Sequence, residues 1–181
     1  MLNFHKAELA DASFIAQLIN SAYRGETSRK GWTHEADILD GLRIHIDEIA
    51  QIIKPDSAAV SPRFIIIGEK NDEIIATICC EKHNTNAHLG MIAVKPTLQN
   101  KGYGKAIIQA AEAITLREWR VTGFAMDVIS IRTELLAFYE RLGYKPTGKL
   151  STFPVNPLIW QPKVNGLKLA RLEKLIKTAQ P

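Results

Sequence analysis

The sequence has few of the features that mark specialised classes of protein. It contains only 2 cysteines among 181 residues, and no apolar run reaches the roughly 18 residues that a membrane-spanning helix needs. Residues 1–8 also lack the basic and apolar segments of a secretory signal. We therefore expect neither a disulfide scaffold nor a membrane protein, and we expect a cytoplasmic location.

The two cysteines, Cys79 and Cys80, are neighbours in an apolar run. Alternation along a strand would point them to opposite faces, where a mutual disulfide is geometrically poor. We expect two reduced core residues. His83 and His88 follow this run, but the sequence has no C-x-x-C or H-E-x-x-H spacing, so no metal site is expected.

A strong excess of one charge is also missing. The chain has 23 basic and 19 acidic residues, a net charge of +4, without a long basic run. This balance argues against a nucleic-acid partner and is compatible with a small anionic ligand. With 46% hydrophobic and 23% charged residues the composition is that of an ordinary globular protein, and the length predicts one domain over 1–181.

Hydrophobic periodicity predicts alternating helices and strands. A helix begins near Asp11 with an apolar stripe that includes Phe14. Thr33 is the expected cap of a second helical region, which ends before Pro55 and is either continuous or broken near Gly41. The other predicted helices cover 104–119 and 135–142, and the predicted strands cover 2–9, 64–67, 74–80, 87–94 and 124–129. The segment 167–176 is predicted to begin as a strand, with a helix as the alternative for its later half. This order predicts an α+β fold, a three-layer α/β/α arrangement with a mixed, mostly antiparallel sheet flanked by helices.

The segment 94–106 joins a strand to a helix and carries the clearest chemical signal. Gly102 and Gly104 at such a junction allow backbone N–H groups to converge on an anion at the helix N-terminus. Lys101 and Lys105 add positive charge. The expected ligand is a phosphate or a pyrophosphate.

Two common nucleotide-binding motifs do not fit this segment. A P-loop would need glycine in place of Gln99 and serine or threonine in place of Ala106. A dinucleotide fingerprint would need glycine in place of Ile107. The anion site therefore belongs to another class.

Two motifs in succession carry a resemblance to a known family. The first is Gln99-x-x-Gly102-x-Gly104-Lys105 after Ile92-Ala93-Val94, and the second is Leu136-x-x-Tyr139-Glu140-Arg141-Leu142-Gly143-Tyr144. Together they resemble the GCN5-related N-acetyltransferase (GNAT) family, and the order of elements agrees across nearly the whole chain. The segment 21–37 is similar to an uncharacterised bacterial and fungal subgroup. The resemblance implies the GNAT acyl-CoA N-acyltransferase fold, with acetyl-CoA as the acyl donor.

The resemblance also implies where the donor binds. The pyrophosphate of acetyl-CoA would lie on the amides of the turn, the pantetheine would follow the preceding strand, and an amide near Val94 would face the thioester carbonyl. Arg132 stands where many members carry an asparagine that holds CoA, so its guanidinium either contacts the donor or faces solvent. The implied donor-site residues are Ile92, Ala93, Val94, Asn100, Lys101, Gly102, Tyr103, Gly104, Lys105 and Arg132.

Direct transfer to an amine requires two proton movements, because the amine must be neutral and the departing sulfur must be protonated or stabilised. Tyr139 matches the tyrosine general acid of the family. Asp127 falls where N-terminal-protein acetyltransferases of the family carry a glutamate base. Glu81 and a water molecule are the alternatives to Asp127.

The resemblance places the acceptor between the first helices and the late strands. Aromatic and guanidinium groups are available there, from Tyr23, Arg24, Arg29, Trp32 and Phe153. We expect Arg24 or Arg29 to pair with a carboxylate on a small amino-acid-like amine, since a planar guanidinium suits a bidentate anion. Peptide N-termini and protein lysines are alternative acceptors.

Two functions of other classes remain as alternatives. A catalytically silent acyl-CoA-binding sensor or assembly protein would keep the anion cradle without turnover. A nucleic-acid-binding protein would show strongly salt-dependent affinity, which the net charge of +4 disfavours. The resemblance is also compatible with a homodimer.

Overall fold

A mixed sheet of seven strands forms the centre of the structure, a computed structural model that describes residues 2–55 and 61–176. The strands of this sheet are β1 (Asn3–Lys6), β3 (Arg63–Lys70), β4 (Glu73–His83), β5 (Asn86–Val94), β6 (Gly123–Ile129), β7 (Lys145–Thr152) and β9 (Lys168–Leu175). Their order is β1-β3-β4-β5-β6-β9-β7, and only the β5–β6 pair is parallel. A small second sheet pairs β2 (Leu39–Gly41) with β8 (Trp160–Pro162).

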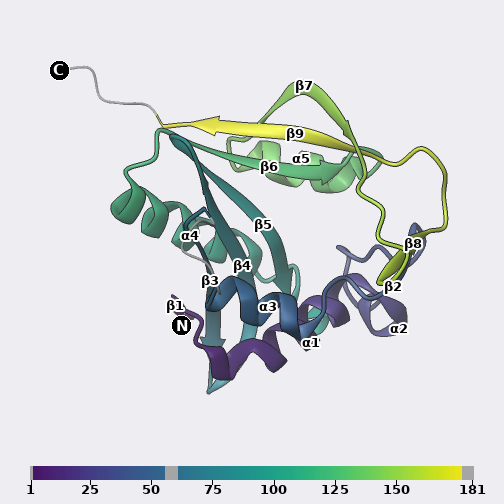
Figure 1. Ribbon diagram of the computed structural model, residues 1–181, viewed down its shortest axis with the longest axis horizontal. Coiled ribbons are helices and arrows are strands. Elements are labelled where there is room, and N and C mark those ends of the chain that lie inside the picture. Colours follow the sequence, from purple (N-terminus) through teal and green to yellow (C-terminus); the bar gives the residue numbers. More distant parts are fainter. Residues whose placement is uncertain (1, 56–60, 177–181) are drawn as a thin grey trace.

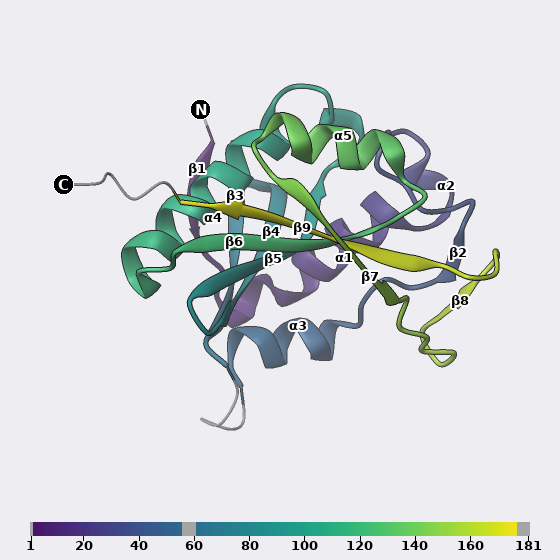
Figure 2. The same ribbon diagram turned by 90° about the horizontal axis from the view of Figure 1, so that it is seen from above.

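Helices cover both faces of the large sheet, as Figures 1 and 2 show. Helices α4 (Tyr103–Trp119) and α5 (Thr133–Arg141) pack on one face, and α1 (Ala12–Tyr23) and α3 (Ile46–Ile53) pack on the other. Short helical turns η1 (Leu9–Asp11), α2 (Gly25–Ser28) and η2 (Pro96–Leu98) complete the described elements. The three-layer α+β architecture predicted from the sequence is confirmed. No helix in the described ranges combines the length and the apolar character that crossing a membrane requires.

The side chains of the adjacent cysteines point to opposite faces of the sheet, as the alternation along a strand predicts. Cys80 belongs to the core under α4 and α5, and Cys79 belongs to the core under α1 and α3. Both are buried and free. Burial raises the pKa of the Cys79 thiol to about 12, so this thiol stays protonated and unreactive at neutral pH.

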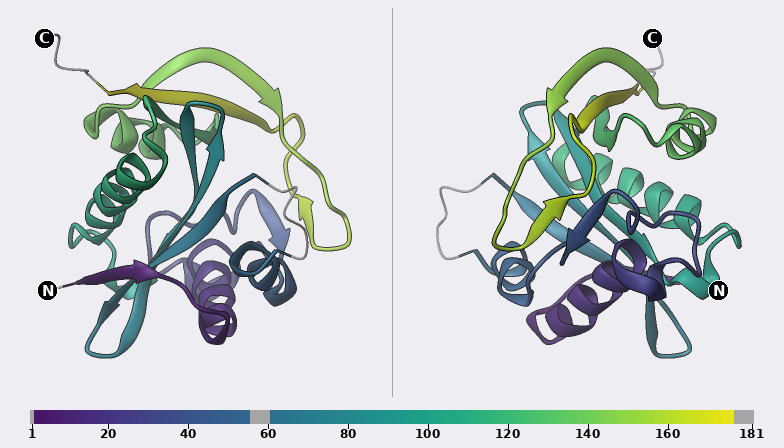
Figure 3. Two further views of the ribbon diagram at one scale, coloured as in Figure 1. Left: turned by 60° about the vertical axis from the view of Figure 1, so that its left-hand side comes forward. Right: turned by 90° about the vertical axis from the view of Figure 1, so that its right-hand side faces the viewer.

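Strands β5 and β6 pair only at their beginnings. Asn86, Ala87 and His88 face Gly123–Ala125, after which β5 continues to Val94 without further pairing to β6. The register between β4 and β5 shifts near Thr77, where Met91 adopts a positive φ of 48°. This bulge bends β5 away, and Figure 3 shows the two halves of the sheet diverging. The open edge of β5 is therefore available to a ligand.

The prediction of helical structure between Thr33 and Lys54 is wrong for the first half of this region. Turns, β2 and a loop occupy this part, and the helix α3 covers only Ile46–Ile53. The hydroxyl of Thr33 does not cap a helix, because it accepts a hydrogen bond from the side chain of the distant Gln99. A local capping signal was thus overridden by a tertiary contact.

The apolar stripe predicted for α1 also needs one correction. Phe14 is 63% exposed, whereas Ile15, Leu18 and Ile19 are buried. These three residues define a stripe at helical spacing, and Phe14 lies outside it.

The side chain of Asn20 fixes the connection between β2 and α3. Its oxygen accepts hydrogen bonds from the backbone N–H groups of Arg43 at 2.7 Å and Ile44 at 3.2 Å. Its amide nitrogen donates to the carbonyl of Ile44 at 2.9 Å. The side chain of Asn20 thereby supplies the hydrogen-bond partners that these backbone groups of the loop would otherwise lack.

Replacing Asn20 with alanine should lower the free energy of unfolding by about 2–3 kcal/mol, because three hydrogen bonds to the backbone are lost. Urea unfolding followed by circular dichroism measures this. The control is Gln17→Ala on the exposed side of the same helix, which should change stability by less than about 0.5 kcal/mol. An Asn20→Ala variant as stable as the control variant would contradict this role.

Candidate active site

A cavity of about 440 Å³ lies where β5 ends and α4 begins. The turn before α4 forms one wall, through Asn100, Gly102, Gly104 and Lys105, and α5 forms the opposite wall. Its volume is in the range of small-molecule sites. The cavity therefore lies at the segment in which the sequence predicted an anion site.

The backbone of the turn is arranged as an anion cradle. Asn100 and Gly102 adopt left-handed conformations, with φ of 62° and 82°. The helical hydrogen-bond ladder of α4 starts with the bond from Ala106 N–H to Gly102 C=O at 3.0 Å. The N–H groups of the preceding first turn therefore lie outside the ladder, at the positive end of the helix dipole.

The space above this cradle is open to an anionic ligand. A Cβ atom added to Gly104 would contact only Phe138 and Val94, at 3.7 and 3.9 Å, so a larger side chain there would occupy the cavity. Lys105 adds a positive charge on the same wall. Lys101 and Tyr103 belong to the turn but are not among the residues that line the cavity, and the Tyr103 hydroxyl instead accepts a hydrogen bond from Lys70.

Backbone groups on the open edge of β5 face this cavity. The carbonyl of Ile92 accepts a hydrogen bond from the Tyr23 hydroxyl at 2.6 Å, and that of Val94 accepts one from the side chain of Gln99 at 3.1 Å. The N–H of Lys95 binds Ile75 of β4, so the alternation of the strand directs the backbone of Val94 toward the open edge. Ala93 is buried in the core under α1 and does not line the cavity.

The side chain of Gln99 joins the turn to the segment 31–33. Its oxygen accepts hydrogen bonds from the N–H groups of Trp32 at 2.8 Å and Thr33 at 3.3 Å. Its nitrogen donates to the Thr33 hydroxyl at 2.9 Å, as well as to Val94. All of its hydrogen-bonding positions are thus used. Gly31 permits this close approach, because a Cβ atom there would lie 2.5 Å from the Gln99 oxygen.

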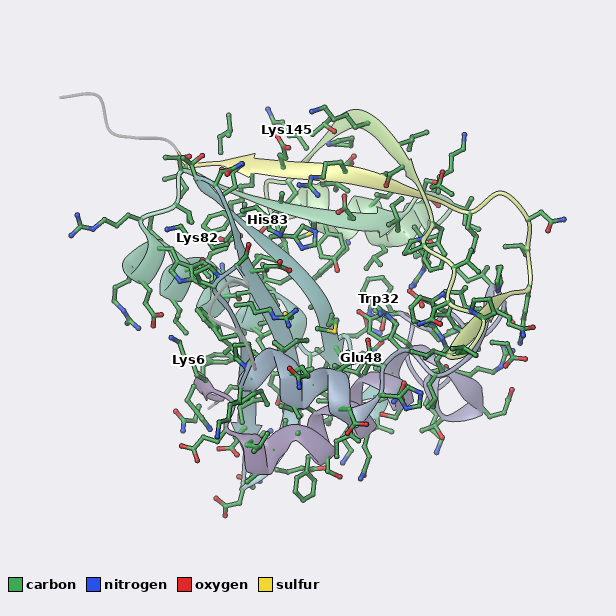
Figure 4. The ribbon with its side chains drawn as sticks, in the orientation of Figure 1. Lys6, Trp32, Glu48, Lys82, His83 and Lys145 are labelled. Atoms are coloured by element: carbon green, nitrogen blue, oxygen red, sulfur yellow. The ribbon has the colours of Figure 1, made fainter. Side chains whose placement is uncertain are left out.

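A second cavity, of about 90 Å³, lies on the other side of the gap between β5 and β6. It shares Tyr23, Ile92, Leu135 and Tyr139 with the first cavity. Phe153 lines this second cavity. Trp32, labelled in Figure 4, lines the first cavity instead and makes an edge-to-face contact with Phe138.

Tyr139 stands at the junction of the two cavities. It is 6% exposed, and burial raises the pKa of its phenol well above the usual value, with further increases from Tyr23 and Glu35. Burial and Glu35 also raise the pKa of Tyr23, to about 12. Both phenols are therefore protonated at neutral pH and can donate hydrogen bonds or protons.

A model of the acetyltransferase (GNAT) family matches residues 17–144, which is more than half of the chain. The chain belongs to the GNAT family. It is accordingly an acetyl-CoA-dependent N-acyltransferase, and the family resemblance inferred from its motifs is confirmed. A search of curated proteins finds no match.

Solved acetyltransferase structures share this GNAT fold over nearly their full lengths. The ribosomal-protein-S18-alanine N-acetyltransferase from Escherichia coli has a TM-score of 0.68 and 14% identity, with 99% of this chain and 97% of that chain covered. A putative phosphinothricin N-acetyltransferase has a TM-score of 0.70 and 15% identity, with coverages of 98% and 100%. The mutant spermidine/spermine N-acetyltransferase SpeG from Vibrio cholerae has a TM-score of 0.65 and 16% identity, with coverages of 97% and 95%. At these identities the likeness shows the fold.

In this GNAT protein Asp127 lies on the second cavity within a charged network. Its carboxylate is 2.7 Å from the guanidinium of Arg171 and 3.1 Å from Nε2 of His88. Burial opposes ionisation, but His88 and Arg171 outweigh it, so the pKa of Asp127 lies below its usual value. Glu81 does not line either cavity and is 3.3 Å from His83, which Figure 4 labels.

The arginines expected to bind the acceptor are already engaged by carboxylates. Arg24 is buried and forms an ion pair with Glu35. Arg29 is exposed, lines neither cavity, and pairs with Glu26 at 3.0 Å and Asp37 at 2.8 Å. Neither arginine lines either of the two cavities.

The guanidinium of Arg132 binds other groups of the protein and does not line the cavity at the anion cradle. Its guanidinium donates to the carbonyl of Thr33 at 2.9 Å and to Glu134 at 3.2 Å, and it lies 3.9 Å from Glu35. It lines the second cavity and not the first. The segment 31–33, which the side chain of Gln99 binds, is therefore also bound by Arg132 at the start of α5.

Sequence reasoning missed Glu35 and Arg43, which both line the second cavity. Both lie in the region predicted to be helical, and the sequence assigned no site role to either residue. The described residues contain no group of three or more histidine, cysteine or acidic side chains that could hold a metal ion.

Replacing Gly31 with alanine should weaken CoA binding about tenfold, because the added methyl would displace the Gln99 amide and with it the wall formed by Trp32 and Thr33. Calorimetric titration of CoA measures the effect. The neighbouring exposed variant Lys30→Ala should bind CoA as the wild type does. A wild-type dissociation constant for Gly31→Ala would show that the Gln99 contact does not shape the cavity.

Proposed function

We propose that this protein transfers the acetyl group of acetyl-CoA directly to the primary amine of a small, amino-acid-like acceptor. The main support is the arrangement of two cavities that meet at Tyr139. The larger cavity has an anion cradle for the donor, and the smaller one has room for a small amine. No covalent intermediate with the enzyme is needed in this scheme.

In the proposed complex the chain binds the donor through its backbone. The N–H groups of the first turn of α4 and the charge of Lys105 hold the pyrophosphate. The open edge of β5 holds the pantetheine, and the N–H of Val94 faces the thioester carbonyl. A donor at that position stabilises the negative charge that develops on the oxygen when an amine attacks.

Acetyl-CoA supplies an activated acetyl group, and the reaction forms a bond from nitrogen to the acetyl carbon while the carbon–sulfur bond breaks. Tyr139 donates its phenolic proton to the departing sulfur. The attacking nitrogen loses a proton into the second cavity, to a water molecule or to Asp127. This proton subsequently restores the phenol, so protons balance over one turnover.

Asp127 is proposed to orient the amine and the water rather than to act as a strong base. Its lowered pKa keeps it ionised but makes it a weak proton acceptor. The position of Asp127 at the second cavity favours it over Glu81.

The proposed activity is tested by measuring thiol release from acetyl-CoA. The acceptor panel contains free amino acids, phosphinothricin, an alanine-terminated peptide and spermidine. Release with free amino acids supports the proposal. CoA binding without release on any acceptor would favour a silent acyl-CoA-binding protein, and release only with peptides or spermidine would replace the acceptor class.

Replacing Tyr139 with phenylalanine should lower kcat by about 10²–10⁴-fold, because the departing sulfur loses its proton donor. The dissociation constant of CoA should stay within about twofold. Steady-state kinetics and calorimetry measure both. The control Tyr144→Phe removes a buried hydroxyl that binds Glu112 outside both cavities, and it should leave kcat nearly unchanged. A Tyr139→Phe enzyme with wild-type kcat would remove Tyr139 from the mechanism.

The raised pKa of Tyr139 predicts how kcat of the wild-type enzyme depends on pH in the alkaline range. A general acid works only below its own pKa, and burial moves this value upward, so the phenol stays protonated throughout the neutral and mildly alkaline range. We expect kcat not to fall as the pH rises to about 9.5. A descending limb near pH 8 in the pH profile of kcat would contradict the assignment.

A further inference from the structure

The charged residues that line the second cavity are two carboxylates and two arginines, and they differ in how they are paired. They are Glu35, Arg43, Asp127 and Arg132. Glu35 pairs with Arg24 and lies 3.9 Å from Arg132, and Asp127 pairs with Arg171 at 2.7 Å. Each carboxylate on this cavity is therefore already neutralised by a guanidinium group.

Arg43 is different from the other arginines at this cavity. Over residues 2–55 and 61–176, its guanidinium has no ion pair and no side-chain hydrogen bond, although the residue is partly buried. An arginine side chain is always charged. The other arginine on the cavity, Arg132, lies 3.2 Å from Glu134. Among the described residues that line this cavity, Arg43 is therefore the arginine without a carboxylate partner.

The backbone that carries Arg43 is held in place before any ligand binds. Asn20 accepts hydrogen bonds from the N–H groups of Arg43 and Ile44 and donates to the Ile44 carbonyl. Ile44 is only 4% exposed and packs in the core under α1. A group fixed in this way loses little conformational freedom on binding, which favours affinity for a matching anion.

We propose that Arg43 is the specificity-determining residue of the acceptor site, where its planar guanidinium binds the carboxylate of the acceptor. This inference rests on the proposed function and narrows it to primary amines that carry a carboxylate near the amine, as free amino acids do. Apolar lining from Met126, Phe153 and Leu169 would contact a small apolar side chain. The role that the sequence suggested for Arg24 or Arg29 thus passes to Arg43.

The charge balance also argues against cationic acceptors. A polyamine would place its additional ammonium groups near an unpaired guanidinium, in a cavity whose carboxylates are already bound. Like charges in a partly buried site repel each other. The preference should therefore be for anionic over cationic amines.

Matched pairs of acceptors test the role of Arg43. L-alanine is compared with L-alaninamide, and L-methionine with L-methioninamide, by thiol release from acetyl-CoA. The ammonium group of each amide is more acidic than that of the corresponding free amino acid. A larger fraction of the amide is therefore present as the neutral amine that attacks, so without Arg43 the amide should be the better acceptor. We expect kcat/KM to be at least about tenfold higher for the carboxylate member of each pair, since a hydrogen bond between two charged groups is stronger than one to a neutral amide.

The variant Arg43→Gln should raise KM for the carboxylate acceptors at least tenfold and remove the preference within each pair. Its kcat with the amides and its dissociation constant for CoA should match the wild type, which also shows that the variant is folded. The control Arg117→Gln changes an exposed arginine of α4 outside both cavities and should retain the preference.

Several results would overturn the inference. One is equal or better turnover of the amides by the wild type, and another is an equal loss for both members of each pair in Arg43→Gln. Turnover of spermidine or peptides without turnover of free amino acids would overturn it while leaving acetyl transfer to a primary amine intact. No thiol release with any amine would contradict the proposed function and this inference together.

Discussion

Strand β5 pairs with β6 over three residues and then separates from it, and the functional geometry depends on this separation. A continuous sheet would have used the outer backbone groups of Ile92 and Val94 for strand pairing. The bulge near Met91 instead leaves an open edge between two cavities. The first cavity lies at the end of β5, the second cavity is lined by residues of β6, and Tyr139 from α5 lines both. We propose the first as the donor site and the second as the acceptor site.

The segment 31–35 connects the two sides of this gap. Gln99 from the donor turn binds the backbone of Trp32 and Thr33, and Arg132 from α5 binds the carbonyl of Thr33. Two residues further on, Glu35 lines the second cavity. Trp32 and Thr33 thus form a wall of the first cavity, while the same short segment contributes to the second. A partly buried hydrogen-bond network of this kind favours one arrangement of both cavities.

The sequence predicted the parts of the site whose geometry is local. The turn from Asn100 to Lys105 follows from glycine positions and a helix start, and the helix of Tyr139 follows from apolar spacing. The acceptor side could not be predicted in this way, because partners far apart in the chain decide it. Gln99 and Thr33 are 66 residues apart, and Arg132 and Thr33 are 99 apart. These contacts replace the expected helix with a loop and hold Trp32 at the first cavity. Arg43 is held at the second cavity by Asn20, 23 residues away in the sequence.

The most direct test of this account is a crystal structure of the protein with acetyl-CoA bound. We expect the pyrophosphate on the backbone amides at the start of α4, the pantetheine along the open edge of β5, and the thioester sulfur within hydrogen-bonding distance of the Tyr139 hydroxyl. Acetyl-CoA bound with its thioester away from the gap between β5 and β6 would contradict the central claim.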